Sequence, residues 1–173
     1  AADSGAQHWT ASVPAAWDKL QPTVANGSLY LAHETGVTAF DTAGGDELWT
    51  SGRPVTEYGP YLTSPTVTGD TVYASGSAVL DDGPDGIVAL DAATGDRLWG
   101  APVARIHRGI DGPAVAGDVV LQPDGEQSLC AFDAVTGEEL WRLHRDAPVS
   151  QPALGDGRFY LADGLGVSAF GGA

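Results

Sequence analysis

An eleven-residue phrase that occurs three times constrains the fold of this chain more than any other feature. The copies are residues 39–49, 89–99 and 131–141, and they share the skeleton Ala-x-Asp-x-x-(Thr/Gly)-Gly-x-x-Leu-Trp. The tryptophans at positions 9, 49, 99 and 141 are spaced by 40, 50 and 42 residues. Repeats of about 40–50 residues are typical of four-stranded β-propeller blades. The sequence therefore predicts an all-β propeller with four blades in this chain.

A fourth copy of the phrase is split between the two ends of the chain. Residues 3–9 match its second half, with Gly5 four residues before Trp9, and residues 167–170 match its first half. Because an open sheet edge is a liability that ring closure removes, we expect the N-terminal strand to complete the last blade. The strand and the blade belong either to one chain, in a four-bladed ring, or to two chains, in an eight-bladed ring. A third alternative is that the chain is part of a longer propeller.

Each repeat contains four short apolar runs, here called strands A to D, which are separated by turn residues such as Asn26-Gly27 and Asp156-Gly157. No segment of useful length has the 3.6-residue apolar period of a helix. We expect a single propeller domain over residues 1–173. Its predicted parts are a closing outer strand at 1–10 and blades at 20–50, 63–100, 112–142 and 151–170.

The recurring residues of the phrase have a structural interpretation. A glycine in the C–D turn leaves room for a tryptophan against the backbone, and a short acidic residue accepts N–H bonds across the turn. A buried tryptophan can hold neighbouring blades together. We therefore expect structural docking, rather than ligand binding, from one set of residues. The set is Trp9, Trp49, Trp99, Trp141, Asp41, Asp91, Asp133, Gly45, Gly95 and Gly137.

The phrase resembles the tryptophan-docking repeat of the PQQ-like, or quinoprotein-type, β-propellers. The resemblance covers essentially the whole chain, although Gly44 replaces Thr in the first copy and Gly171 stands where Asp is expected in the split copy. That family includes quinoprotein alcohol dehydrogenases, an outer-membrane assembly scaffold lipoprotein, and sensor domains attached to bacterial Ser/Thr kinases. Family rings usually hold seven or eight blades set at a shallow angle. The resemblance therefore favours a ring of two chains, with a second copy as partner.

The resemblance does not extend to the chemistry of the dehydrogenases. Those enzymes carry a vicinal Cys pair over the quinone and a calcium set of Glu, Asn and Asp, whereas this chain has one Cys, Cys130, and one Asn, Asn26. We expect no enzymatic activity and no cofactor, and a dehydrogenase fragment is the least favoured interpretation. The four histidines lack metal-ligand spacing, so we expect no metal site.

Charge and hydropathy exclude further classes of function. The net charge is −15, from 8 basic and 23 acidic residues, which disfavours nucleic-acid binding. No apolar run approaches the ~18 residues of a membrane span. The chain contains no Met, so we expect that a leader, a preceding domain or a tag has been removed. A location outside the cytoplasm is favoured and a cytoplasmic one is left open, while the Ala- and Gly-rich composition suggests a bacterial source.

Basic and aromatic residues concentrate in the expected D–A connections, on the face opposite the tight turns. Arginine suits carboxylates and phosphates, and arginine with aromatics also anchors protein interfaces. The sequence therefore predicts a binding rim for a protein or a small polar or anionic ligand. Its candidate residues are Trp17, Arg53, Tyr58, Tyr61, Arg105, His107, Arg108, His144 and Arg145. The alternative is that these arginines neutralise acidic loops on the same rim, such as 81–82 and 124–126.

A second, weaker candidate site is the mouth of the central channel. Gln21, Ser64 and Gln151 each precede the proline that opens strand A. We expect a non-enzymatic domain that binds a ligand or a protein at one of these sites. The resemblance implies a sensor or interaction domain of a bacterial signalling protein such as a Ser/Thr kinase, and the alternative is a scaffold for envelope-protein assembly.

Overall fold

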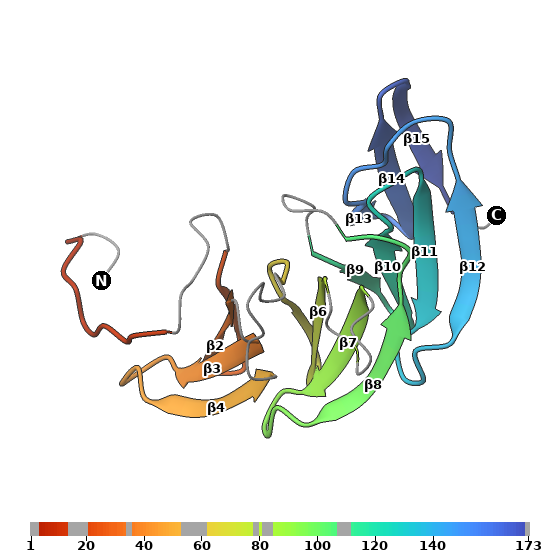
Figure 1. Cartoon of the computed structure of the whole chain (residues 1–173). Coiled ribbons are helices and arrows are strands. Elements are labelled where there is room, and N and C mark those ends of the chain that lie inside the picture. Colours follow the sequence, from red (N-terminus) through yellow and green to blue (C-terminus); the bar gives the residue numbers. More distant parts are fainter. Residues whose placement is uncertain are drawn as a thin grey trace.

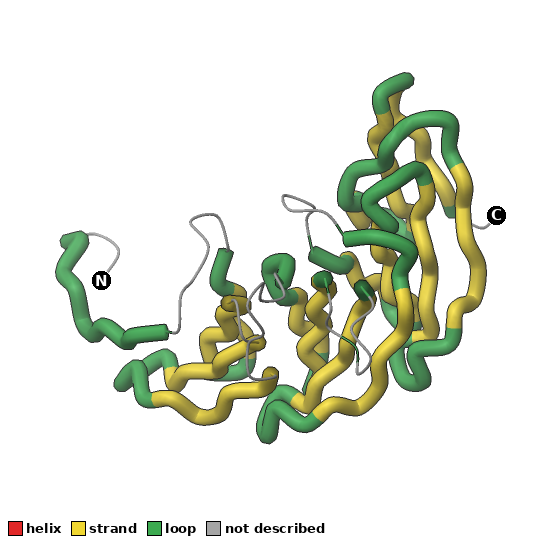
Figure 2. The backbone as a smooth tube through the Cα atoms, viewed as in Figure 1, coloured by secondary structure: helices red, strands yellow, loops and turns green. Residues whose placement is uncertain are grey.

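The computed structural model describes residues 4–13, 21–33, 36–52, 62–77, 80, 85–106 and 112–171, and these residues contain no helix. Their strands form three four-stranded antiparallel sheets and one three-stranded antiparallel sheet. The sheets succeed one another along an open arc (Figure 1), and the trace consists of strands joined by turns and loops (Figure 2). The predicted all-β propeller with four blades in the chain is confirmed.

Each sheet is one blade, and its strands follow in chain order from the inside of the arc to the outside. Blade 1 contains β1 (Thr23–Ala25), β2 (Ser28–His33), β3 (Gly36–Asp41) and β4 (Glu47–Gly52). Blade 2 contains β5 (Thr66–Thr68), β6 (Thr71–Gly76), β7 (Gly86–Asp91) and β8 (Arg97–Pro102). Blade 3 contains β9 (Ala114–Ala116), β10 (Val119–Pro123), β11 (Ser128–Asp133) and β12 (Glu139–His144). Blade 4 contains β13 (Ala153–Gly155), β14 (Arg158–Asp163) and β15 (Gly166–Phe170).

The hydrophobic core lies between blades rather than within them. Strands β3, β7 and β11 are buried on both faces, because each lies in a sheet with packed neighbours, and this explains their nearly continuous apolar sequences. Along each such strand, alternate residues face opposite directions. Val37 and Ala39 face the following blade, where they share a cluster with Val88 and Leu90. Similar clusters join blade 2 to blade 3 and blade 3 to blade 4.

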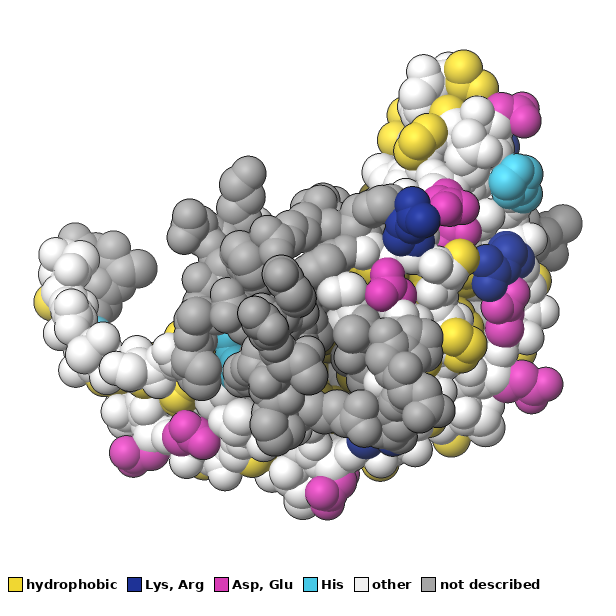
Figure 3. All heavy atoms as spheres, in the orientation of Figure 1, with side chains coloured by type: hydrophobic (Ala, Val, Ile, Leu, Met, Phe, Trp, Pro, Cys, Tyr) yellow, Lys and Arg dark blue, Asp and Glu magenta, His cyan; other side chains and the backbone are white. Residues whose placement is uncertain are grey.

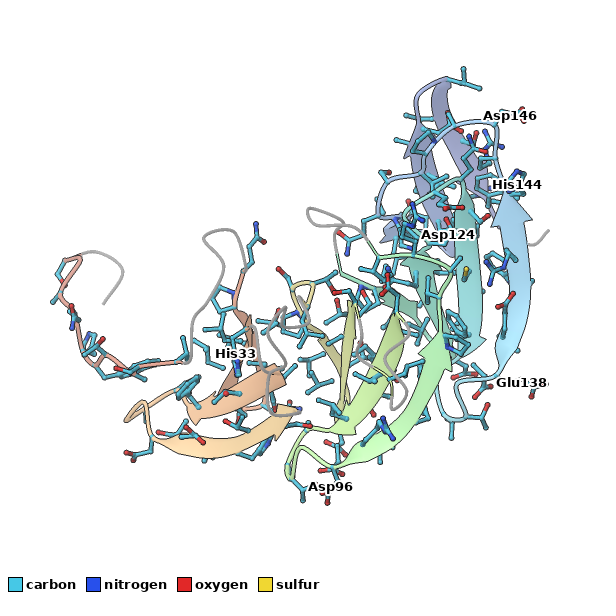
Figure 4. The ribbon with its side chains drawn as sticks, viewed as in Figure 1. His33, Asp96, Asp124, Glu138, His144 and Asp146 are labelled. Atoms are coloured by element: carbon cyan, nitrogen blue, oxygen red, sulfur yellow. The ribbon has the colours of Figure 1, made fainter. Side chains whose placement is uncertain are left out.

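The A–B and C–D turns of a blade lie together on one face of the arc. The backbone N–H of Ala92 donates to Asp70 O at 2.9 Å, and the N–H of Ala134 donates to Asp118 O at the same distance. Figure 4 shows Asp96 and Glu138 at this turn face, whereas His144 lies at the other end of β12. The opposite face carries the D–A and B–C connections, as the sequence predicted for a binding rim.

The two ends of the chain lie at opposite ends of the arc (Figure 1). Residues 4–13 form an N-terminal arm beside blade 1, with Trp9 against Gly45 of the C–D turn. Within the described parts of the chain, the arm does not pair with β15, which remains the edge of a three-stranded sheet. A single chain is therefore not closed into a four-bladed ring, and completion of the last blade by a second chain stays a prediction.

A polar row crosses blade 1 from buried residues of β2 and β3 to exposed residues of β4. His33 is inaccessible, and its Nε2 lies 2.8 Å from Thr38 Oγ1, which lies 2.7 Å from Thr50 Oγ1. The hydroxyl of Thr50 donates to Glu47 Oε1 at 3.0 Å. Burial lowers the pKa of His33, and the nearby Glu47 carboxylate opposes this effect only in part.

The lowered pKa of His33 predicts that stability falls as the solution is acidified. Below the ordinary value of 6.5 the unfolded chain binds a proton at this histidine that the folded chain resists. This one group can contribute a slope of at most about 1.4 kcal/mol per pH unit. Urea unfolding between pH 5 and pH 8 should show this loss in the wild type and a shallower pH dependence in His33→Gln. An equal slope in both proteins would contradict the assignment.

Candidate functional site

Three of the nine predicted rim residues lie in the described part of the chain. They are Arg105, which follows β8, Arg145, which follows β12, and His144. These three residues lie on the face opposite the C–D turns. His144 is the last residue of β12, so it belongs to strand D rather than to the connection after it. Trp17, Arg53, Tyr58, Tyr61, His107 and Arg108 lie outside the described residues.

Arg145 is held by the last blade. Its Nε donates to Asp163 Oδ2 at 2.9 Å, its Nη2 lies 2.8 Å from the same oxygen, and Nη2 also donates to Ser168 Oγ at 3.3 Å. The guanidinium lies 5.9 Å from the ring centre of Phe170. The backbone N–H of Leu165 and the Arg145 side chain hold the pKa of Asp163 below its usual range. Arg145 therefore clamps the end of blade 3 to β14 and β15.

Arg142 makes a similar contact within blade 3. Its Nη2 lies 2.8 Å from Glu139 Oε2 and its Nη1 lies 3.6 Å from Asp124 Oδ2. The Asp124 side chain is nearly inaccessible and accepts the backbone N–H groups of Glu126 and Ser128, both at 2.9 Å. Hydrogen bonding to Glu139 raises the pKa of Arg142. Asp124, labelled in Figure 4, directly follows β10.

Arg105 is the most exposed of these arginines. Its Nε lies 3.9 Å from Glu126 Oε1, with 58% of the Arg105 side chain and 55% of the Glu126 side chain exposed. A pair this exposed contributes little to stability. Figure 3 shows basic side chains beside acidic ones over blades 3 and 4. For Arg142 and Arg145, this pairing favours the alternative that the arginines neutralise acidic groups of the same rim.

The predicted channel-mouth residues connect neighbouring blades. The backbone N–H of Gln21 donates to Ser64 Oγ at 3.0 Å, and Gln151 Nε2 donates to Gly112 O at 2.7 Å. The amide of Gln151 is therefore occupied by the chain itself.

Sequence reasoning missed two threonines of the same inner ring. Thr23 Oγ1 donates to Pro65 O at 2.6 Å, and Thr66 Oγ1 donates to Pro113 O at 2.5 Å, so each ties one strand A to the next. The sequence pattern that could have identified them is the threonine that follows the proline opening strand A in blades 1 and 2.

Three tryptophans lie against the glycine of the next C–D turn. A Cβ built on Gly45, Gly95 or Gly137 would come within 2.6 Å of the indole of Trp9, Trp49 or Trp99, respectively. Each indole N–H donates to a backbone carbonyl of that turn: Thr42 at 2.9 Å, Ala92 at 3.0 Å and Ala134 at 3.0 Å. The three glycines have φ near +75°, a conformation that a side chain disfavours.

The turn aspartates hold the same loops. Asp91 Oδ1 accepts the backbone N–H groups of Ala93 and Thr94, both at 2.9 Å. Asp133 Oδ1 accepts the N–H of Thr136 at 2.8 Å, and the backbone and hydroxyl of Thr136 lower the pKa of Asp133. These contacts use the carboxylates within the turns, in line with the structural interpretation of the phrase.

Trp141 is the exception among the tryptophans. Its exposed fraction is 39%, against 8% for Trp49 and Trp99. Its ring stacks on Phe159 with centroids 5.9 Å apart, and Phe159 stacks on Phe170 at 4.8 Å. A groove of about 570 Å³ lies beside these rings, between blades 3 and 4.

Cys130 lies on β11 between blades 2 and 3 and is fully buried. Burial raises the pKa of its thiol to about 12, so it is not a nucleophile at neutral pH. Among the described residues, no three His, Cys, Asp or Glu side chains gather in a group that could hold a metal ion. The described part of the chain also has no helix with the length and apolar character to cross a membrane.

Four-stranded blades joined by indoles packed on turn glycines define this chain as a PQQ-like β-propeller. A family model described as outer membrane protein assembly factor BamB matches residues 1–111 and 84–171. The chain belongs to this family. No curated protein matches the chain significantly.

Solved structures share the fold at low sequence identity. The structure of BamB from Moraxella catarrhalis matches 83% of this chain at 20% identity with a TM-score of 0.64, and this region is 42% of that chain. A europium-containing methanol dehydrogenase matches 83% of this chain and 39% of its own, at 16% identity and a TM-score of 0.59. The chain thus spans about two fifths of these two proteins. The computationally designed Ika4 protein matches 91% of this chain and 94% of its own, at 14% identity and a TM-score of 0.63.

Proposed function

We propose that this chain is a non-enzymatic binding propeller that holds a protein partner on the face carrying its D–A and B–C connections. The observation that carries the proposal is the match, across nearly the whole chain, to a family described as an outer membrane protein assembly factor. An envelope-protein assembly scaffold is accordingly the first candidate role. A location outside the cytoplasm is part of the same proposal.

The residues present do not fit the quinone chemistry of the dehydrogenase relatives. The single cysteine, Cys130, is buried between two blades, so no vicinal pair can lie over a quinone. Asn26, the only asparagine, has φ +51° in an A–B turn, and its side chain donates to Gly69 O at 2.9 Å. Both residues are used by the fold itself. Their placement supports a role without a redox cofactor.

A sensor domain attached to a bacterial Ser/Thr kinase is the second candidate role. It is supported by the resemblance of the repeated phrase to kinase-attached propellers. The two roles share the proposed binding face, which comprises the nine predicted rim residues. A second copy of the chain is a further proposed partner, at a surface distinct from this rim.

Among the described rim arginines, Arg105 is the best placed to meet a partner. Arg142 and Arg145 are committed to Asp124, Glu139 and Asp163 within the chain, whereas the Arg105 side chain is 58% exposed. Arginine is one of the residue types enriched among the anchors of protein interfaces.

A photo-cross-linking amino acid placed at Arg105 tests the proposed face. We expect irradiation in cells of the source organism to link it to a second protein, identified by mass spectrometry. The matched control is the same amino acid at Val135, which is 81% exposed in a C–D turn on the opposite face. Several-fold higher yield from position 105 is expected. Equal yields from the two positions, or adducts to this chain alone, would contradict the proposed binding face.

A further inference from the structure

The contact between a tryptophan and a turn glycine has two unpaired members, and these lie at opposite ends of the arc. Trp141 occupies the place of Trp49 and Trp99 in its blade, but the residues described after β15 include no C–D turn to receive it. In the described part of the chain, its indole N–H has none of the carbonyl partners that Trp9, Trp49 and Trp99 have. One tryptophan thus lacks its glycine.

The complementary half lies on the N-terminal arm. Gly5 precedes Trp9 by four residues, as Gly45 precedes Trp49, and its φ of +64° is close to the +76° of Gly45. A Cβ on Gly5 would meet nothing within 4 Å, whereas the same atom on Gly45 would strike an indole. One glycine thus lacks its tryptophan, in the conformation that the other glycines adopt.

The face of blade 4 that points away from blade 3 carries apolar residues whose counterparts in the other blades are buried, but this face is exposed. Val167 corresponds by position to Val37, Ile87 and Leu129; its exposed fraction is 75%, and theirs is at most 1%. Ala169 is likewise exposed, whereas the matching alanines of the other blades are inaccessible.

At the other end of the arc, blade 1 also has apolar residues that are incompletely buried. On the face of β2 that points away from blade 2, Leu29 and Leu31 are only half-buried. The corresponding Val72 and Ala74 of blade 2 are fully buried against blade 1. Both ends of the arc therefore present apolar sheet faces of the kind that pack together at every internal blade junction.

We propose that two copies of this chain close into one eight-bladed ring, in which the N-terminal arm of each copy is the outer strand of the other copy's blade 4. Gly5 of one copy then receives Trp141 of the other, and Val167 is covered by blade 1 of the other copy. A two-fold axis makes both junctions identical, so no blade edge is left open. The register of the complete blades places Thr10 opposite Ser168, as Thr50 lies opposite Thr38.

Solution mass and one pair of glycine variants test this ring. Light scattering on residues 1–173 should give twice 17.7 kDa over a wide concentration range. Gly5→Ala should weaken dimerisation at least about a hundredfold, because its Cβ would occupy the place of the indole. Gly27→Ala is the matched control, since Gly27 also has positive φ and open space but lies in an A–B turn of blade 1. A wild-type monomer, or equal masses for the two variants, would overturn the proposal.

A disulfide between the proposed partners separates the two-chain ring from its alternatives. Thr38 Oγ1 and Thr50 Oγ1 are 2.7 Å apart, so cysteines at the equivalent positions should bond. Oxidised Thr10→Cys/Ser168→Cys should run as a covalent dimer without reductant, and neither single variant should do so. A linked monomer would mean a ring closed within one chain, and a ladder of larger species would mean open filaments. Each of these outcomes, like the absence of any link, would overturn the two-chain ring.

Discussion

Replacing Trp99 by Ala should lower the free energy of unfolding by about 3–5 kcal/mol, as expected for a buried tryptophan. The indole is 8% exposed, joins the cluster between blades 2 and 3, and donates to Ala134 O at 3.0 Å. Tyr73 lies against the same ring with centroids 5.9 Å apart, and its hydroxyl donates to Ala134 O as well. Truncation would therefore leave a cavity at the blade junction and remove one hydrogen bond of the turn.

Chemical denaturation followed by circular dichroism measures this loss. The control is Leu98→Ala on the same strand, where the side chain is 54% exposed and the expected change is below about 1 kcal/mol. Similar losses in the two variants would mean that Trp99 does not hold the junction between blades.

Replacing Gly95 by Ala should lower the free energy of unfolding by about 2–4 kcal/mol, from backbone strain and overpacking together. Gly95 has φ +77°, and a Cβ at this position would lie 2.5 Å from Cε3 of Trp49. The indole cannot retreat without giving up its bond to Ala92 O at 3.0 Å. Either the ring or the turn must move, and both belong to the junction between blades 1 and 2.

Gly69→Ala separates these two causes. Gly69 also has positive φ, at +58°, but a Cβ there would meet nothing within 4 Å. Its substitution should cost about 1–2 kcal/mol, the strain of an L-residue in the left-handed region. The same denaturation experiment compares the two variants. If Gly69→Ala costs as much as Gly95→Ala, the contact with Trp49 adds nothing to backbone strain.

The repeated phrase was sufficient to predict the fold because each of its residues has a local task. The glycine at 45, 95 and 137 adopts positive φ, and the aspartate before it accepts turn N–H groups, so sequence spacing alone indicates four similar blades. The spacing within one phrase does not show that each tryptophan packs on the glycine of the following blade; the structure adds this for Trp9, Trp49 and Trp99.

The electrostatic environment of the rim could not be predicted in the same way. Sequence reasoning placed Arg145 on a binding rim, with neutralisation of acidic loops such as 81–82 and 124–126 as the alternative, but did not identify its partner. Arg145 binds Asp163, a residue outside the repeated phrase that lies 18 positions away. It placed His144 in a connection, whereas the strand continues through that residue. Ion pairing depends on distances across neighbouring strands and blades, and these follow from the three-dimensional twist of the sheets rather than from any local pattern.

Because the core is divided among the junctions between neighbouring sheets, no blade has an interior of its own. The free energy of folding should then behave as a sum of nearest-neighbour couplings along a one-dimensional stack. Inner blades 2 and 3 each have two couplings, whereas blade 4 has one within the chain, through the cluster it shares with blade 3. Unfolding would consequently begin at the end of the arc and progress blade by blade, and sealing the two ends would convert this gradual loss into a single cooperative transition.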